Sequence, residues 1–322
     1  MTMPTIVTFT INPAVDISTS VAVVQPAHKL RCTAPRRDPG GGGINVARVA
    51  TRFGADVLAV FAAGGLIGQH LKELVDREGI RNLPIPIRGD TREDLAVFES
   101  ETGQQYRFVL PGPAFAESEW RACLDVLASP DTKSRFLVAS GSLPPGVPDD
   151  FYARVVKAMR GTGDKDAKII IDTSGTPLKR ALDAGVYLIK PNLREMRELT
   201  GQSMGCESDC ISACRELVEA GHAEVVALTL GHYGAMLVTR DLALRADPLP
   251  IKPVSTVGAG DSFLAALVTR LATGHDLQDA FRYAVAAGSA ALLAPGTELA
   301  RPEDVERLLG AVTVRSIDPA KV

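Results

Sequence analysis

Between residues 136 and 200 the chain reads FLVA (136–139), FYARVVKAM (151–159), III (169–171), YLI (187–189) and LREMRELT (193–200), with turn residues between the segments. The three short apolar runs predict strands, and the two longer segments have helical spacing. The runs are apolar on both faces, which is typical of strands that helices cover on both sides. Strands that alternate with helices indicate βα units and a mainly parallel sheet.

The same alternation continues on both sides of this stretch, and no linker or low-complexity segment interrupts it. We therefore expect one α/β domain over residues 1–322. Its further strands are predicted at Ile6–Ile11, Val57–Phe61 and Val225–Leu230, and its further helices at Gly68–Glu78, Cys206–Ala220, Asp261–Ala272, Leu277–Ala294 and Pro302–Gly310. Because ligands collect beyond the carboxyl ends of strands in such sheets, the loops after the strands are the place to look for chemistry.

Two extended segments break the alternation, Val21–Cys32 and Asp94–Leu110, and the second is strand-like at Leu95–Phe98 and Gln105–Val109. We interpret them as a small β-sheet inserted into the α/β domain, with lid segments at about residues 17–37 and 91–110. Such a sheet could serve as a lid or as a dimer surface. An ordinary pair of edge hairpins is the alternative.

Composition excludes several classes of protein. The 322 residues carry 35 basic and 38 acidic side chains, a formal charge of −3, which argues against a general nucleic-acid binder. The cysteines number five and form no CxxC pair, which disfavours a disulfide scaffold and favours a reducing compartment. No signal-peptide core stands at the N-terminus, and no window approaches the ~20 apolar residues of a membrane-spanning helix. We expect a cytoplasmic protein with no nucleic-acid or membrane partner.

The first glycine cluster reads Pro39-Gly40-Gly41-Gly42-Gly43-Ile44-Asn45, and no Gly-Lys dipeptide occurs to make a Walker P-loop. Four glycines allow the backbone to approach a ligand closely and to adopt positive φ. We predict that Asn45 opens the following helix, where free N–H groups favour polar or anionic partners. The alternative is a flexible turn with an N-cap Asn.

The second glycine cluster reads Ser255-Thr256-Val257-Gly258-Ala259-Gly260-Asp261-Ser262-Phe263, and an apolar helix follows it. The backbone amides of residues 258–261 could form an anion cradle that the helix dipole reinforces. Asp261 stands at its lip, where a carboxylate can accept a proton from a substrate hydroxyl while the amides stabilise a transferring phosphoryl group. If Asp261 were only the N-cap of this helix, the two glycines would stay unexplained.

A third motif, Lys190-Pro191-Asn192-Leu193-Arg194-Glu195, follows a predicted strand directly. Asn192 and Glu195 are three residues apart at a helix start, so both side chains can meet a hydrated Mg²⁺ ion at the sheet edge. The same spacing is that of a capping box. Spacing alone leaves the two interpretations open.

Together these motifs resemble the ribokinase-like (PfkB) family of sugar kinases, in the family's order and over essentially the whole chain. The runs Lys29–Pro35, Gln105–Val109 and Ser140–Gly146 are similar to its phosphosugar branch, above all to the ribokinase-type ATP-dependent 6-phosphofructokinases. The resemblance implies a three-layer α/β/α fold with a mainly parallel central sheet and a small inserted lid sheet. It also implies a homodimer joined through the lids.

The resemblance further implies roles for particular residues. Asp261 would be the general base, with Gly258, Ala259 and Gly260 as the anion hole. The sugar phosphate would be bound by Asp16, Lys29, Arg31, Gly41, Gly42, Asn45, Arg92, Arg107 and Ser142. The nucleotide would be bound by Lys190, Asn192, Thr229, Gly231, Gly234, Thr256, Gly258 and Gly260. Asn192 and Glu195 would hold Mg²⁺ largely through water, and K⁺ is suggested at the carbonyls of Ser255, Val257, Ala291 and Gly296.

The implied reaction is the ATP-dependent phosphorylation of fructose 6-phosphate at its 1-hydroxyl, which gives fructose 1,6-bisphosphate in glycolysis. Phosphorylation of fructose 1-phosphate or tagatose 6-phosphate is the alternative within the branch. A non-catalytic sugar-phosphate sensor on the same fold is the alternative of another class. Thr229 stands where a Ser is common in the family, and its hydroxyl could serve equally.

Overall fold

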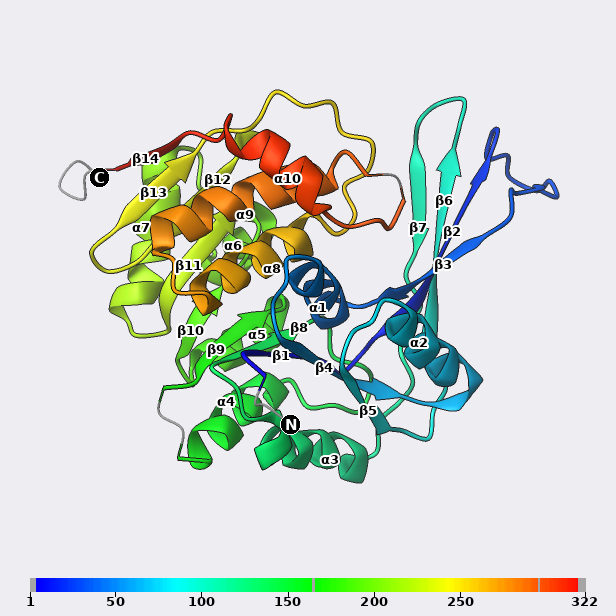
Figure 1. The fold of residues 1–322 in the computed structure, drawn as a ribbon, viewed down its shortest axis with the longest axis horizontal. Helices are drawn as coiled ribbons and strands as arrows, with labels where there is room; N and C mark the ends of the chain where they lie inside the picture. The colour runs from blue at the N-terminus through cyan, green and yellow to red at the C-terminus, as the bar shows by residue number, and fades with distance from the viewer. Residues whose placement is uncertain (1–3, 164–165, 295, 318–322) are drawn as a thin grey trace.

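The computed structural model describes residues 4–163, 166–294 and 296–317. Its main element is a ten-stranded sheet of order β14-β13-β12-β11-β10-β9-β8-β1-β4-β5 (Figure 1). Neighbours from β5 to β11 are parallel, and β12, β13 and β14 are added antiparallel. The predicted, mainly parallel sheet is thereby confirmed. Its strands are β1 (Ile6–Thr10), β4 (Val57–Ala63), β5 (Asn82–Pro86), β8 (Phe136–Ser140), β9 (Lys168–Asp172), β10 (Val186–Ile189), β11 (Ala223–Thr229), β12 (Ala235–Val238), β13 (Ala243–Ala246) and β14 (Val314–Ser316).

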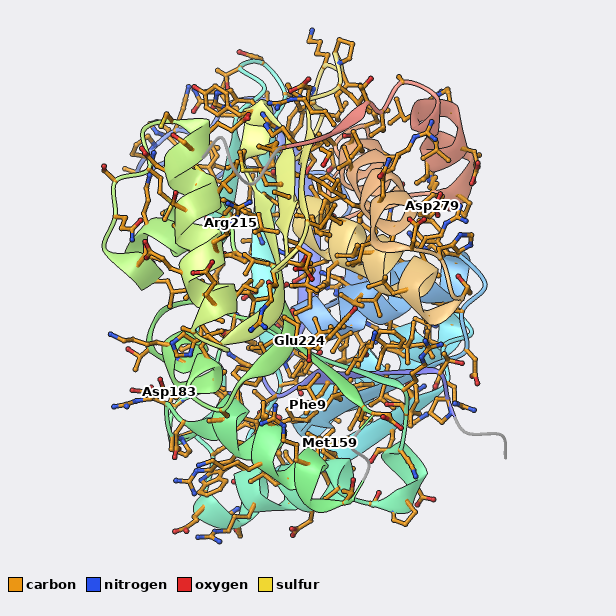
Figure 2. All side chains as sticks on the ribbon, turned by 90° about the vertical axis from the view of Figure 1, so that its left-hand side faces the viewer. Phe9, Met159, Asp183, Arg215, Glu224 and Asp279 are labelled. Atoms are coloured by element: carbon orange, nitrogen blue, oxygen red, sulfur yellow. The ribbon has the colours of Figure 1, made fainter. Side chains whose placement is uncertain are left out.

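Helices cover both faces of this sheet. Successive strand residues point to opposite faces, and both faces carry apolar side chains that the helices bury. Ile6 belongs to one hydrophobic cluster and Val7 to the other. The first cluster includes α1 (Gly42–Arg52), α2 (Gly65–Arg77), α8 (Ala259–Ala272), α9 (Leu277–Ala291) and α10 (Pro302–Leu309). The second includes α3 (Glu117–Leu127), α4 (Phe151–Gly161), α5 (Gly175–Leu182), α6 (Leu193–Thr200) and α7 (Glu207–Glu219), and Figure 2 labels its members Phe9 and Met159. The result is the expected three-layer α/β/α fold.

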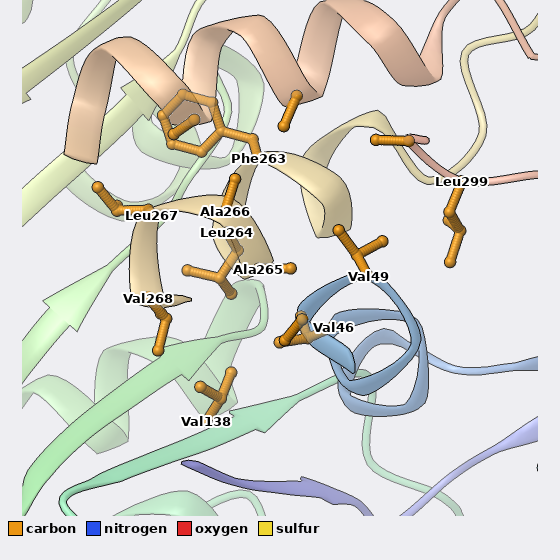
Figure 3. Close-up of a cluster of buried hydrophobic side chains, with 14 of the residues drawn as sticks. Val46, Val49, Val138, Phe263, Leu264, Ala265, Ala266, Leu267, Val268 and Leu299 are labelled. Carbon is orange, nitrogen blue, oxygen red and sulfur yellow. The ribbon is translucent and has the colours of Figure 1, made fainter. Parts of the chain in front are cut away.

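Helices α1 and α8 pack directly against each other within the first cluster (Figure 3). Val46 and Val49 of α1 lie beside Leu264 and Ala265 of α8, and all four side chains are fully buried. Burial of an aliphatic side chain such as Val or Leu contributes about 1.5–3 kcal/mol. This contact fixes the start of α1 next to the start of α8, where both glycine clusters lie.

The small sheet has the order β3-β2-β6-β7 and projects from the main body beside α2 (Figure 1). It consists of β2 (Ala14–Val21), β3 (Arg36–Gly40), β6 (Arg92–Glu99) and β7 (Gln105–Phe108). The predicted inserted sheet and its second strand pair are therefore present. The expectation of an extended segment at Val21–Cys32 is wrong, because β2 ends at Val21 and residues 22–35 form a loop.

Several elements differ from the prediction at the C-terminal side. Helix α9 ends at Ala291 rather than at residue 294, and three short antiparallel strands, β12 to β14, were not predicted. Strands β13 (ALRA) and β14 (VRS) each contain an arginine, so no apolar run marks them. Strand β12 (AMLV) is an apolar run of the kind that predicted the other strands, and it was overlooked. None of the helices in the described ranges has both the length and the apolar character that crossing a bilayer requires.

Candidate active site

Polar groups gather at the carboxyl ends of neighbouring parallel strands. Ser140 ends β8, Asp172 ends β9, and Lys190 follows β10. The Ser140 hydroxyl donates to the Asp172 carboxylate over 3.2 Å, and the Lys190 ammonium lies 3.3 Å from the other oxygen of that carboxylate. This edge of the sheet is where open α/β sheets bind their ligands.

The first glycine cluster packs tightly against this edge. A Cβ added at Gly40 would lie 2.4 Å from the Asp16 carboxyl. One added at Gly42 would lie 2.1 Å from the Ser140 hydroxyl, and one at Gly43 would lie 2.6 Å from the Phe9 carbonyl. Gly41 has φ +110°, a conformation that side chains disfavour. The glycines therefore fit the loop against the sheet end, a packing reason beyond the close ligand approach that we predicted.

The two glycine clusters meet through Asn45 and Asp261. The Asn45 amide donates a hydrogen bond from Nδ2 to Asp261 Oδ2 over 2.8 Å. Helix α1 begins at Gly42, so the prediction that Asn45 opens it is wrong by one turn. Gly258, with φ +71°, is the N-cap of α8, so the alternative that Asp261 caps this helix is also wrong. Asp261 therefore lies in the first turn of α8 without capping it, and its carboxylate can contact a substrate as well as Asn45.

The surroundings of Asp261 favour its neutral form. Desolvation and then repulsion from Asp172 raise the pKa of its carboxyl to about 6, while the Asn45 hydrogen bond and the charges of Lys190 and Arg107 lower it. A carboxylate of this pKa is ionised at neutral pH, yet it binds a proton more readily than an exposed one. It therefore has the properties of a general base.

Lys190 places a cation beside the start of α8. Its ammonium is almost buried, and a Cβ added at Gly260 would lie 3.1 Å from it. Burial lowers the pKa of Lys190, but attraction to Asp172, Asp261 and Glu195 outweighs it, so the net pKa is raised. The amino group stays charged next to the amides of the second glycine cluster.

Asp16, which we predict to bind the sugar, lies within β2. It stands directly opposite Asp38 on β3 and Asp94 on β6. Desolvation first, and then repulsion from Asp94, raise the pKa of Asp16 to about 7, against the opposing charges of Arg107, Arg48 and Arg92. A partly enclosed carboxyl among arginines is suited to hold the hydroxyls of a bound polyol.

Of the residues predicted to bind the sugar phosphate, some are fixed by hydrogen bonds within the protein and others are exposed. Arg92 donates to Asp94, to the Leu110 carbonyl and to the Asn12 carbonyl over 3.1, 3.0 and 3.2 Å. Ser142 accepts a hydrogen bond of 3.1 Å from the Asn12 side chain. Arg107 is exposed on β7, close enough to act electrostatically on Asp16 and Asp261. Lys29 and Arg31 are exposed in the loop after β2, and their substrate role stays a prediction.

Asn192 and Glu195 form the capping box that their spacing allows. Asn192 Oδ1 accepts from the Glu195 amide and Glu195 Oε2 accepts from the Asn192 amide, each over 2.9 Å. A bridge to Asn192 brings Thr229 alongside, and the turn Gly231–Tyr233 follows with Gly234 at φ +93°. These residues, predicted to bind the nucleotide and Mg²⁺, therefore lie together at the carboxyl ends of β10 and β11. Thr256, also predicted to bind the nucleotide, is exposed in the loop before α8.

The residues predicted to offer carbonyls to K⁺ lie around the start of α8 and the end of α9. The Ser255 hydroxyl donates to the Gly296 carbonyl over 2.9 Å, and the Val257 amide donates to the same hydroxyl over 3.2 Å. Ala291 is the last residue of α9. Two hydrogen bonds therefore join three of the four residues, and the cation role of all four stays a prediction.

Three residues of the site were not predicted from the sequence: Asn12, Asp94 and Asp172. Asp172 follows the predicted strand at 169–171 directly, and a carboxylate at a strand end was a signal that could have found it. Asp94 holds Arg92 and accepts from the Leu110 amide over 2.9 Å. No pattern in the sequence distinguishes it from an exposed strand residue.

Comparison with known proteins places this site in a family. The family model described as pfkB family carbohydrate kinase matches residues 10–304. The chain is 46% identical over 304 residues, 94% of this chain and 88% of the relative, to an ATP-dependent 6-phosphofructokinase isozyme 2 of Mycobacterium tuberculosis. It is 32% identical over 97% of this chain to a 1-phosphofructokinase of Borreliella burgdorferi, 99% of which is covered. The crystal structure of phosphofructokinase-2 from Escherichia coli in complex with potassium superimposes with a TM-score of 0.91 at 38% identity, covering 96% of this chain and 99% of that one. The chain belongs to the pfkB family of carbohydrate kinases.

Proposed function

We propose that this protein transfers the γ-phosphoryl group of ATP to the 1-hydroxyl of fructose 6-phosphate. The observation that carries the proposal is the placement of the Asp261 carboxylate in the first turn of α8, hydrogen-bonded to Asn45 and flanked by the Lys190 cation. The names of the relatives from M. tuberculosis and E. coli support the choice of substrate. A structure of the E. coli protein is described as a complex with fructose-6-phosphate.

Each residue then has a task in an in-line displacement. Asp261 takes the proton of the attacking hydroxyl, and the amides of residues 258–260 face the charge that spreads over the transferring group. Lys190 adds a positive charge beside these amides. Arg92 and Arg107 hold the sugar phosphate, for which guanidinium groups provide paired donors. The small sheet acts as the lid that excludes water.

The residues present fit the ions that the family chemistry needs. Capping uses one of the roughly four acceptor sites of the Glu195 carboxylate, so oxygen ligands remain for a hydrated cation. Glu195 and Asn192 would hold Mg²⁺ largely through water, and the ion would neutralise charge on the triphosphate. The carbonyls of Ser255, Val257, Ala291 and Gly296 would serve K⁺.

The test is the release of ADP with fructose 6-phosphate, fructose 1-phosphate and tagatose 6-phosphate, each assayed with MgATP. We expect the highest kcat/KM with fructose 6-phosphate. A higher value with fructose 1-phosphate would move the protein to the activity named for the B. burgdorferi relative. Binding of fructose 6-phosphate without any ADP release would establish the non-catalytic sensor instead.

Replacement of Asp172 by Asn is expected to move the acid limb of the kcat profile to lower pH. A general base must be ionised to act, so kcat rises as pH passes through its pKa. Repulsion from Asp172 raises the pKa of Asp261, and its removal lowers that pKa. The measurement is kcat between pH 5 and pH 8 at saturating substrates. An acid limb that stays in place would show that Asp172 does not influence the base.

We also expect a homodimer joined through the small sheets. Large apolar side chains are exposed on β6, on β7 and in the segment after β7, namely Leu95, Phe98, Phe108, Val109 and Leu110. Leu95 and Phe108 stand opposite each other in the register of β6 and β7, so these two side chains share one face of the small sheet. Exposed apolar side chains of this size favour an interaction surface, and the uncovered edge strand of a sheet needs a partner. A monomer in light scattering at micromolar concentration would contradict this expectation. A structure of the E. coli relative is described as a tetrameric inhibited form, so the light scattering must also distinguish a dimer from a tetramer.

A further inference from the structure

Arg48 is a buried cation inside helix α1. Its side chain is 1% exposed, and it is the largest of the fully buried side chains described. Nε donates to Glu78 Oε1 over 2.8 Å, and Nη1 donates to the Pro39 carbonyl over 3.0 Å. Nη1 also reaches Asn45 Oδ1 at 3.4 Å. A buried charge is costly unless it is paired and hydrogen-bonded, so these contacts hold the guanidinium in one position.

The chemistry of the guanidinium decides how the Asn45 amide is turned. A guanidinium can only donate hydrogen bonds, so the amide oxygen of Asn45 must face Arg48. The amide NH₂ group is then directed to Asp261, 2.8 Å away. With the opposite orientation, Asn45 would present an oxygen to the carboxylate and an NH₂ group to the cation, and both contacts would be repulsive.

We propose that Arg48 is a positioning residue, which, anchored by Glu78, fixes the Asn45 amide so that its NH₂ group holds the Asp261 carboxylate in the orientation for proton transfer. The inference rests on the proposed function, because it assumes that Asp261 is the base. It assigns to the chain Glu78–Arg48–Asn45–Asp261 a task beyond joining α1 to α8.

The alternative is that Arg48 only fastens the glycine loop and α1 to α2 and β3. Nη2 of Arg48 also lies 3.7 Å from Asp38 on β3, and such contacts would matter for stability alone. The two roles differ in their effect on Asp261. The groups that face this carboxylate are Asn45 from α1, Asp172 from β9, Lys190 after β10 and Arg107 from β7. Of these only Asn45 touches Arg48, so a change at Arg48 reaches the base through Asn45.

The helix offers a matched control one turn further on. Arg52 pairs with the other oxygen of Glu78 over 3.2 Å and contacts the Leu299 carbonyl, but it makes no described contact with Asn45. Arg48→Met and Arg52→Met therefore each remove one positive charge from α1 and one ion-pair partner from Glu78. Only the first frees the Asn45 amide.

We expect Arg48→Met to lower kcat by about 10–100-fold, the usual effect of a small misplacement of a catalytic group. The acid limb of its kcat profile moves to higher pH, because a freed amide no longer stabilises the ionised base. Arg52→Met keeps the wild-type profile. In a double-mutant cycle, Arg48→Met adds little to the loss in Asn45→Ala, because both changes remove one interaction.

Two results would overturn the inference: an unshifted acid limb in Arg48→Met, or full additivity with Asn45→Ala. If Arg48→Met fails to fold, Arg48→Lys decides in the same way, since one ammonium cannot serve Glu78, Pro39 and Asn45 together. Asp261→Asn is assayed in parallel. If it keeps its activity, the proposed base is wrong. If it loses activity while Arg48→Met keeps the wild-type profile, only the positioning role is wrong.

Discussion

Replacement of Asp261 by Asn is expected to lower kcat by about 10²–10⁴-fold, the range for the loss of a positioned base. Asn has nearly the same shape as Asp but cannot take up the proton of the attacking hydroxyl. Burial disfavours the charged form of Asp261, which is why its pKa is raised. A neutral Asn at this position should therefore let the protein fold normally. The measurement is kcat with MgATP and fructose 6-phosphate, alongside thermal unfolding.

An exposed carboxylate provides the control for this variant. Asp183, labelled in Figure 2, is exposed at the C-terminal end of α5. It precedes the start of β10, whereas the site lies at the carboxyl ends of the strands, so Asp183→Asn should keep wild-type kcat. Near-normal turnover of Asp261→Asn would remove this residue from the chemistry. It would also leave the sensor as the remaining explanation of the site.

Replacement of Lys190 by Met is expected to lower kcat/KM for MgATP by about 10²–10³-fold. This is the usual effect of the loss of one donor aimed at developing charge. Lys190 is the cation beside Gly260, and Met fills the same volume without charge. The variant also leaves Asp172 without its 3.3 Å partner, and an uncompensated charge of this kind costs about 3 kcal/mol of stability.

Kinetics and unfolding must therefore be measured on the same preparation. Lys72→Met removes an exposed lysine that pairs with Asp76 on α2, and it should change neither quantity by much. A Lys190→Met variant with lower stability but an unchanged kcat/KM for MgATP would show that Lys190 serves the fold alone. A variant with unchanged stability and lower kcat/KM would assign it to the nucleotide.

Most helices of the two layers are predicted from the sequence because they carry a long periodic signal, but α3 (Glu117–Leu127) and α5 (Gly175–Leu182) were not predicted. Helix α6 is observed at Leu193–Thr200, as predicted, since Asn192 caps its start and Gly201, at φ +72°, ends it. Strands of the parallel sheet carry apolar runs, such as FLVA in β8 and III in β9, and such runs predict burial on both faces. The short strand β13 (ALRA) contains an arginine and has no such run.

The site is less predictable because side-chain orientation depends on contacts distant in sequence. The hydrogen bond of Asn45 joins residues 216 positions apart, and Asp16 pairs across two strand partners that only the fold brings together. Motifs identify Asn45 and Asp261 as candidates. They do not reveal that Arg48 stands behind Asn45, since a basic residue in a helix is usually exposed.

The most direct test is a crystal structure with a non-hydrolysable ATP analogue, Mg²⁺ and fructose 6-phosphate. We predict the terminal phosphate within about 3 Å of the amides of Ala259 and Gly260, with the sugar 1-hydroxyl in contact with the Asp261 carboxylate. A terminal phosphate bound away from these amides, or a sugar that turns its 1-hydroxyl away from Asp261, would contradict the proposed transfer.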